Sequence, residues 1–177
     1  MNKKIKQTFL GVLLVFGAIL VTGCLPGNNN DAPVEPVALI DGFERHETDY
    51  YEIQFPSDWT RNGSRFIAPD ESVEINIVRE ELPMAMSAEE YKEASLEALQ
   101  NAFGASMRST TTGEKTVNGM EAFTISYDLA MRGVPRPIAT FQTLLTHNTT
   151  GFVITIAGIT DETREIYEQM LSTFAPK

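Results

Sequence analysis

The dipeptide Asn118-Gly119 most constrains how this chain folds, because it separates two segments that have the character of β-strands. Both residues tolerate a positive φ, so a two-residue turn of this kind joins strands that pair antiparallel. Residues 107–117, before the turn, are polar and rich in threonine, which suits an edge strand. The strand after the turn carries apolar side chains at alternating positions, namely Phe123, Ile125, Tyr127 and Leu129. The sequence therefore predicts a β-hairpin here.

Further strands are predicted on both sides of this hairpin. Residues 138–147 follow a loop at 132–137, and residues 152–159 follow a turn at 148–151. Because residues 152–159 are apolar on both faces, we expect this strand in the centre of the sheet. Upstream, three shorter segments show the strand pattern, at residues 51–55, 65–68 and 73–77.

Two amphipathic helices are also predicted. Ser87 and Glu90 form a capping box at the start of the first, which we expect to end near Gly104. Thr160 is the predicted N-cap of the second, whose apolar stripe ends at Phe174. Hairpin-linked strands with two such helices predict an α+β fold, with an antiparallel sheet of six or seven strands flanked by helices.

The strand and turn at residues 50–59, Tyr-Tyr-Glu-Ile-Gln-Phe-Pro-Ser-Asp-Trp, resemble the entry motif of the PsbP-like superfamily. The order of elements is similar too, as is the closing stretch Leu-Ser-Thr-Phe at 171–174. That superfamily includes the extrinsic photosystem II subunit, a nuclear Ran-binding factor and many bacterial lipoproteins. The resemblance implies an α-β-α sandwich over residues 43–177, and a binding or assembly role rather than catalysis.

The N-terminal residues have the layout of a secretory signal. Lys3, Lys4 and Lys6 precede an apolar run at residues 9–21, and the chain's one cysteine, Cys24, follows Gly23. This ending resembles the lipobox of bacterial lipoproteins, in which the cysteine is lipidated and becomes the mature N-terminus. We therefore expect a signal peptide at 1–23, lipidation of Cys24, and an extracytoplasmic protein held on the cell membrane, or on the outer membrane if the organism has one. One alternative is an uncleaved membrane anchor, although the apolar run is shorter than the roughly 20 residues of a spanning helix. The other is ordinary signal-peptide cleavage, which would leave Cys24 as a free thiol.

Residues 24–42 contain three prolines and three consecutive asparagines, and no amphipathic period. They are predicted to form a flexible tether that is dispensable for folding, with a single domain at 43–177. From Cys24 onward, 11 Lys and Arg face 24 Asp and Glu, a charge of −13. Such an acidic chain is not expected to bind nucleic acid, which requires a basic surface.

No catalytic motif stands out. There is no Gly-x-Ser-x-Gly sequence and no glycine-rich phosphate loop, so we predict neither an enzyme nor a cofactor. Carboxylate and imidazole groups crowd together at Glu44, His46, Glu47 and Asp49, but their spacing matches no established metal site. These four are weak metal-ligand candidates, and we predict no metal.

Two features remain as candidates for binding. Trp59 is either a core residue, which we favour, or a platform on which a ligand stacks. The loop at 132–137 carries two arginines, Arg132 and Arg136, and two prolines, which indicates either a rigid turn with local ion pairs or a contact for a partner. The sequence as a whole predicts a lipid-anchored domain that binds a protein of the cell envelope or helps an envelope assembly. The alternatives are a lipoprotein that binds a small ligand or metal ion and, third, an enzyme of unrecognised type.

Overall fold

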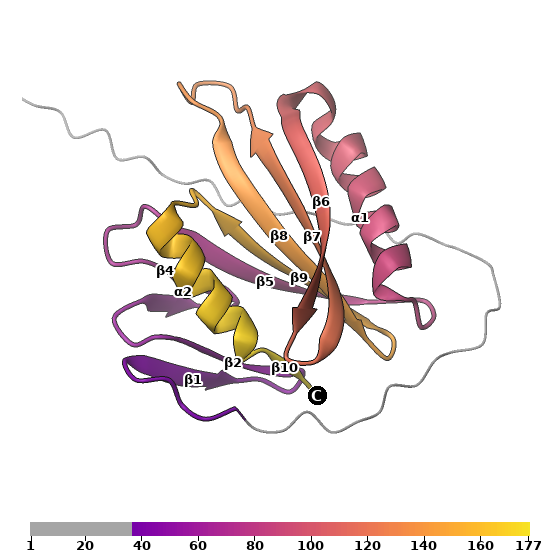
Figure 1. Ribbon diagram of the computed structural model, residues 1–177. Helices are drawn as coiled ribbons and strands as arrows, with labels where there is room; N and C mark the ends of the chain where they lie inside the picture. The colour runs from indigo at the N-terminus through magenta and orange to yellow at the C-terminus, as the bar shows by residue number, and fades with distance from the viewer. Residues whose placement is uncertain (1–36) are drawn as a thin grey trace, which may run out of the picture.

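The computed structural model describes residues 37–177, and its centre is a seven-stranded antiparallel sheet (Figure 1). The predicted signal peptide, Cys24 and the tether up to residue 36 lie outside the described residues. The strands follow one another across the sheet in the order β3 (Thr60–Asn62), β4 (Arg65–Ile67), β5 (Glu74–Glu81), β9 (Thr150–Ala157), β8 (Ile138–His147), β7 (Met120–Leu129) and β6 (Met107–Val117). The apolar strand β9 is central, as its sequence predicts.

Tight turns fix the register of this sheet. Asn118 and Gly119 have φ values of 46° and 82°, so Val117 pairs with Met120 as expected for a primed turn. A second tight turn at Asn148, with φ 54°, pairs His147 with Thr150. The long meander from β6 to β9 is thus set by local sequence.

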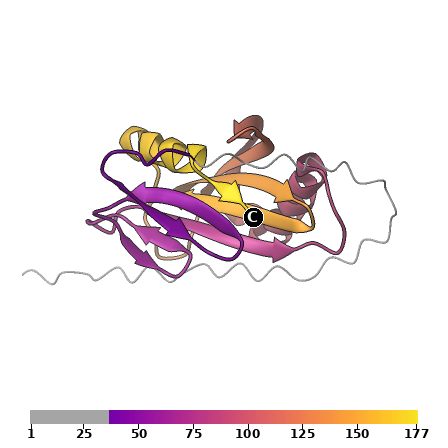
Figure 2. The same cartoon turned by 90° about the horizontal axis from the view of Figure 1, so that it is seen from below.

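A second sheet contains three strands, in the order β1 (Phe43–Glu47), β2 (Tyr51–Pro56) and β10 (Ala175–Pro176). The alternating residues of β2 predict that strand, but β1 and β10 were not predicted. Figure 2 shows β10, the yellow arrow, beside β2, so residues from both ends of the domain meet in this sheet.

The two helices lie on opposite faces of the seven-stranded sheet. Helix α1 (Ala88–Phe103) begins at Ser87 with the predicted capping box, packs on β7 and β8, and is followed by the short 3₁₀ helix η1 (Gly104–Ser106). Helix α2 (Asp161–Ser172) begins at Thr160 and covers the other face together with the three-stranded sheet. The layers are therefore α1, the large sheet, and α2 with the small sheet, which confirms the predicted α+β sandwich. No helix among residues 37–177 is long and apolar enough to cross a membrane.

The core is divided by the large sheet into two clusters. On the α1 side, Tyr91 and Leu99 pack against Ile125, Leu144 and Val153. The larger cluster, on the α2 side, joins both sheets through buried side chains that include Tyr51, Ile53, Phe152, Tyr167 and Phe174.

The sequence predicts Phe174 on the last helix, but in the structure it lies just beyond Ser172, the last residue of α2. Its ring is fully buried, with its centroid 5.5 Å from that of Tyr51 and 5.2 Å from that of Phe152. The residue therefore fastens the C-terminal segment to both sheets.

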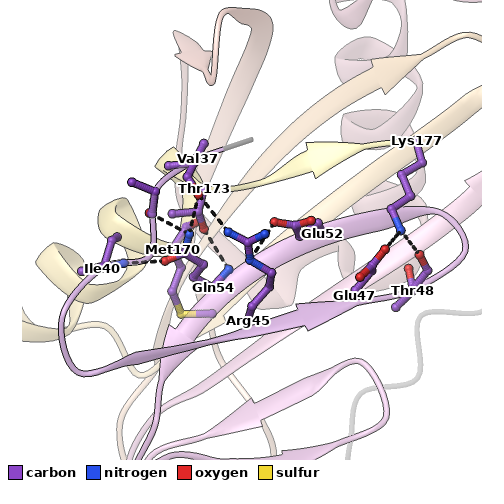
Figure 3. A network of polar contacts seen from close by, with 11 residues as sticks. Val37, Ile40, Arg45, Glu47, Thr48, Glu52, Gln54, Met170, Thr173 and Lys177 are labelled. Carbon is purple, nitrogen blue, oxygen red and sulfur yellow. Dashed lines mark hydrogen bonds and ion pairs between the residues drawn. The ribbon is translucent and has the colours of Figure 1, made fainter. Parts of the chain in front are cut away.

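The structure moves the boundary of the domain upstream of residue 43. Gln54, in β2, is buried, and its side-chain oxygen accepts a hydrogen bond of 2.8 Å from the backbone N–H of Ile40 (Figure 3). Its amide nitrogen donates to the carbonyls of Ala38 at 2.9 Å and Val37 at 3.3 Å, and Arg45 also donates to Val37. These contacts place residues 37–40 within the domain and not in the flexible tether predicted to extend to residue 42. A buried amide needs hydrogen-bond partners, and this segment supplies them.

Candidate functional site

The loop between β7 and β8 carries the two arginines singled out in the sequence. Its backbone turns at Gly133, whose φ is 85°, and the N–H of Val134 donates to the carbonyl of Met131. The side chains of Arg132 and Arg136 are both exposed. Neither forms an ion pair with a carboxylate of residues 37–177, so the described structure gives no support to local ion pairing, one of the two interpretations of this loop.

Most other basic residues of the domain do have a carboxylate partner. The six paired side chains are Arg45 with Glu52, Arg65 with Glu74, Arg79 with Glu81, Lys92 with Glu89 and Glu93, Lys115 with Glu168, and Lys177 with Glu47. Six of the eleven Lys and Arg residues within 37–177 are thus paired. The five in this part of the chain that are not are all arginines, and Arg132 and Arg136 are two of them.

Two further arginines without ion pairs in the described structure lie at the same end of the sheet. Arg108, near the start of β6, is the cross-strand neighbour of Asp128, and the N–H of Ala130 donates to the carbonyl of Ser106 beside it. Arg164, near the start of α2, places its guanidinium carbon 5.3 Å from the centre of the Phe141 ring. That distance is within the range of a cation–π contact. We call Arg108, Arg132, Arg136 and Arg164 the arginine end.

A hollow of about 190 Å³ opens at the arginine end, between α2 and strands β7 and β8. Its lining combines an aromatic ring, hydroxyl groups and both signs of charge, from Ser109, Ser126, Asp128, Thr140, Phe141 and Arg164. It is large enough for one side chain or a very small molecule. Sequence reasoning found the loop but neither this hollow nor Arg108 and Arg164, because strand order and helix placement bring them together.

The weak metal-ligand candidates are held apart by strand β1 and its partners. Residues 37–177 contain no group of three or more His, Cys, Asp and Glu side chains that could hold a metal ion. The ring of His46 packs edge-on against Phe66, with centroids 5.8 Å apart, and burial with nearby Arg61 lowers its pKa. Glu47 instead pairs with Lys177 at 2.6 Å. Glu44, on β1, lies opposite Phe55 of β2, and Asp49 lies in the turn between these two strands.

Trp59 is buried in the larger core cluster, which confirms the core interpretation and leaves no stacking platform there. The other histidine, His147, lies at the end of β8 opposite Thr150. Neither residue contributes to the arginine end.

Comparison with solved structures identifies the fold. The chain is similar to the cyanobacterial PsbP protein CyanoP from Synechocystis sp. PCC 6803, with a TM-score of 0.58 and 12% sequence identity over 88% of this chain and 100% of that one. The described domain has a PsbP-like fold. No protein-family model and no curated protein matches the sequence.

Two other solved structures are similar to the PsbP-like domain. A protein from Bacteroides thetaiotaomicron VPI-5482 has a TM-score of 0.52 and 10% identity, and the match covers 72% of this chain but only 45% of that one. LpqN of Mycobacterium tuberculosis, described as involved in cell envelope biogenesis, has a TM-score of 0.44 and 13% identity over 76% of this chain and 90% of that one. Identities this low establish the fold alone.

Proposed function

We propose that this protein is a lipid-anchored, extracytoplasmic binding protein, without enzymatic activity, whose PsbP-like domain captures a protein of the cell envelope through the loop at 132–137. The observation that carries the proposal is the pair of exposed loop arginines that have no ion-pair partner among the described residues. Arginine is enriched at protein interfaces, and the prolines at 135 and 137 restrict the loop before binding.

Anchoring through Cys24 rests on the sequence, since this residue ends a signal-like segment and is the chain's one cysteine. A lipoprotein with two or more acyl chains stays on its membrane, because each buried methylene contributes about 0.8 kcal/mol. Labelling cells with a radioactive or clickable fatty acid should mark the wild-type protein, and Cys24→Ala should abolish the label. Label that persists in the variant would refute anchoring at this residue.

The binding proposal is tested by capture from the organism's own membranes. The wild-type chain and the R132S/R136S variant are compared by pull-down and quantitative mass spectrometry. Arg61→Ser is a matched control, because Arg61 is also exposed and lacks an ion pair in the described structure but lies on β3, at the opposite edge of the large sheet.

The double variant should remain as stable as the wild type, since exposed charges contribute only about 0–1 kcal/mol. It should lose at least one envelope protein that the control retains. Identical capture by all three chains would show that the loop is only a turn.

A further inference from the structure

The arginine end has three properties that together define an interaction surface. Its four arginines come from three regions that are distant in sequence, the start of β6, the β7–β8 loop and the start of α2. All four side chains are exposed, and none pairs with a carboxylate within residues 37–177. Beside them lies the hollow of about 190 Å³, lined in part by Phe141 and Arg164. Arginine is enriched among the residues that contribute most to affinity at interfaces, and such residues commonly lie at or beside pockets.

Carboxylates are also present at the arginine end, and they weaken its long-range electrostatic attraction for anions. Asp128 lies opposite Arg108, while Asp161 and Glu162 occupy the first turn of α2, where the helix dipole favours them, and Glu165 follows Arg164. The arginine end is therefore close to neutral as a whole, on a domain that is otherwise strongly acidic. Binding here depends on direct contact with guanidinium groups more than on long-range steering.

The arginine end and the segment through which the chain enters the domain lie on opposite sides of it. Figure 1 shows segment 37–42, in indigo, at the bottom of the domain, whereas the loop at 132–137 lies at the top. The chain enters from the lipidated end through segment 37–42, which is hydrogen-bonded to Gln54. The arginine end lies on the side of the domain away from that entry.

We propose, on the basis of the proposed function, that the arginine end binds an acidic segment of the partner protein, with carboxylates paired to the four arginines and one side chain seated in the hollow beside Phe141. Planar guanidinium groups bind carboxylates with two parallel hydrogen bonds, a geometry that lysine does not offer. The rest of the acidic surface repels such a segment. Repulsion elsewhere confines an acidic partner to this one end.

The test uses the protein as purified in detergent from cells that produce the whole chain, and a fluorescein-labelled peptide of eight glutamates. Binding is followed by fluorescence anisotropy. We expect saturable binding that weakens at least about tenfold in R132S/R136S, the loss of about 1.4 kcal/mol that interface arginines commonly exceed. R108S/R164S, which leaves the loop intact, should weaken binding by a similar factor. Arg61→Ser should bind as the wild type does, and a peptide of eight serines should not bind.

Several outcomes would overturn the proposal. The first is the absence of saturable binding, and the second is equal binding by both double variants and the control. The third is displacement of the glutamate peptide by inorganic octaphosphate at one-tenth of the peptide's concentration, which would identify a phosphate polymer as the ligand. Concentration-dependent self-association that R132S/R136S abolishes would assign the surface to a second copy of the chain. If the glutamate peptide fails to bind while membrane capture still depends on the loop, the proposed function stands and only the acidic partner is wrong.

Discussion

Replacing Gln54 by leucine should destabilise the domain through the loss of its contacts with residues 37–40. The side chain makes three hydrogen bonds, to the N–H of Ile40 and the carbonyls of Ala38 and Val37. Each intramolecular hydrogen bond contributes about 0.5–1.5 kcal/mol net, so removing all three should cost about 1.5–4.5 kcal/mol. Leucine fills a similar volume, which keeps the cavity contribution small.

The cause can be isolated by shortening the chain. A chain beginning at Asp41 lacks the three hydrogen-bonding partners and should itself be less stable than one beginning at Leu25. In the shorter chain, Gln54→Leu should cost less than about 1 kcal/mol, because contacting residues have non-additive effects. Gln142→Leu is the control, since Gln142 is an equally buried amide that bonds instead to Thr155 in the large sheet.

The assay is urea unfolding followed by far-UV circular dichroism, with the free energy of unfolding taken from linear extrapolation. The Gln142 variant should lose the same free energy in both chains. An equal cost of Gln54→Leu in both chains would refute the role of the N-terminal segment. A shorter chain as stable as the longer one would also do so, and would restore the sequence-based prediction that this segment is dispensable.

Two further stability predictions concern opposite faces of the large sheet. Phe174→Ala should lower the free energy of unfolding by about 3–5 kcal/mol, because the ring is fully buried between both sheets. A nearly neutral effect in urea unfolding would be incompatible with this packing. Burial raises the pKa of Glu80 above its ordinary value, although the hydrogen bond from Tyr91 has a smaller effect in the opposite direction. The folded state therefore favours the protonated carboxyl, and the free energy of unfolding falls as the pH rises from the ordinary pKa toward the raised one. Glu80→Gln should therefore gain stability relative to wild type as the pH rises above the ordinary glutamate pKa of about 4.5, measured by urea unfolding. A pH-independent difference would contradict the assignment.

The elements that sequence predicts well are those whose causes are local. The turn at Asn118-Gly119, the strands β6 and β8 and the capping box at Ser87 depend on residues within a few positions of one another. Strand β1 escapes prediction because its residues show no clean alternation, and β10 because only two residues of it pair. Both are strands because β2 offers them hydrogen-bonding partners.

The candidate site likewise combines residues that the local sequence reveals with residues that only the tertiary structure brings together. Arg132 and Arg136 are visible in the sequence as part of a loop that contains two prolines. Arg108 and Arg164 join them only through the pairing of β6 with β7 and the packing of Arg164 on Phe141. Gln54 gives an opposite example. Its place at a polar position of an alternating strand predicts exposure, yet residues 37–40 cover it.

The pairing of β2 with β10 also sets an order of events when the chain is made. The backbone N–H of Gln54 donates to the side chain of Thr173, 119 residues later, and β10 follows immediately. At about 5–20 residues per second, synthesis of that interval takes roughly 6–24 s, during which one edge of β2 has no partner. The three-stranded sheet is therefore complete only once residues 175–176 have been made, at the very end of synthesis.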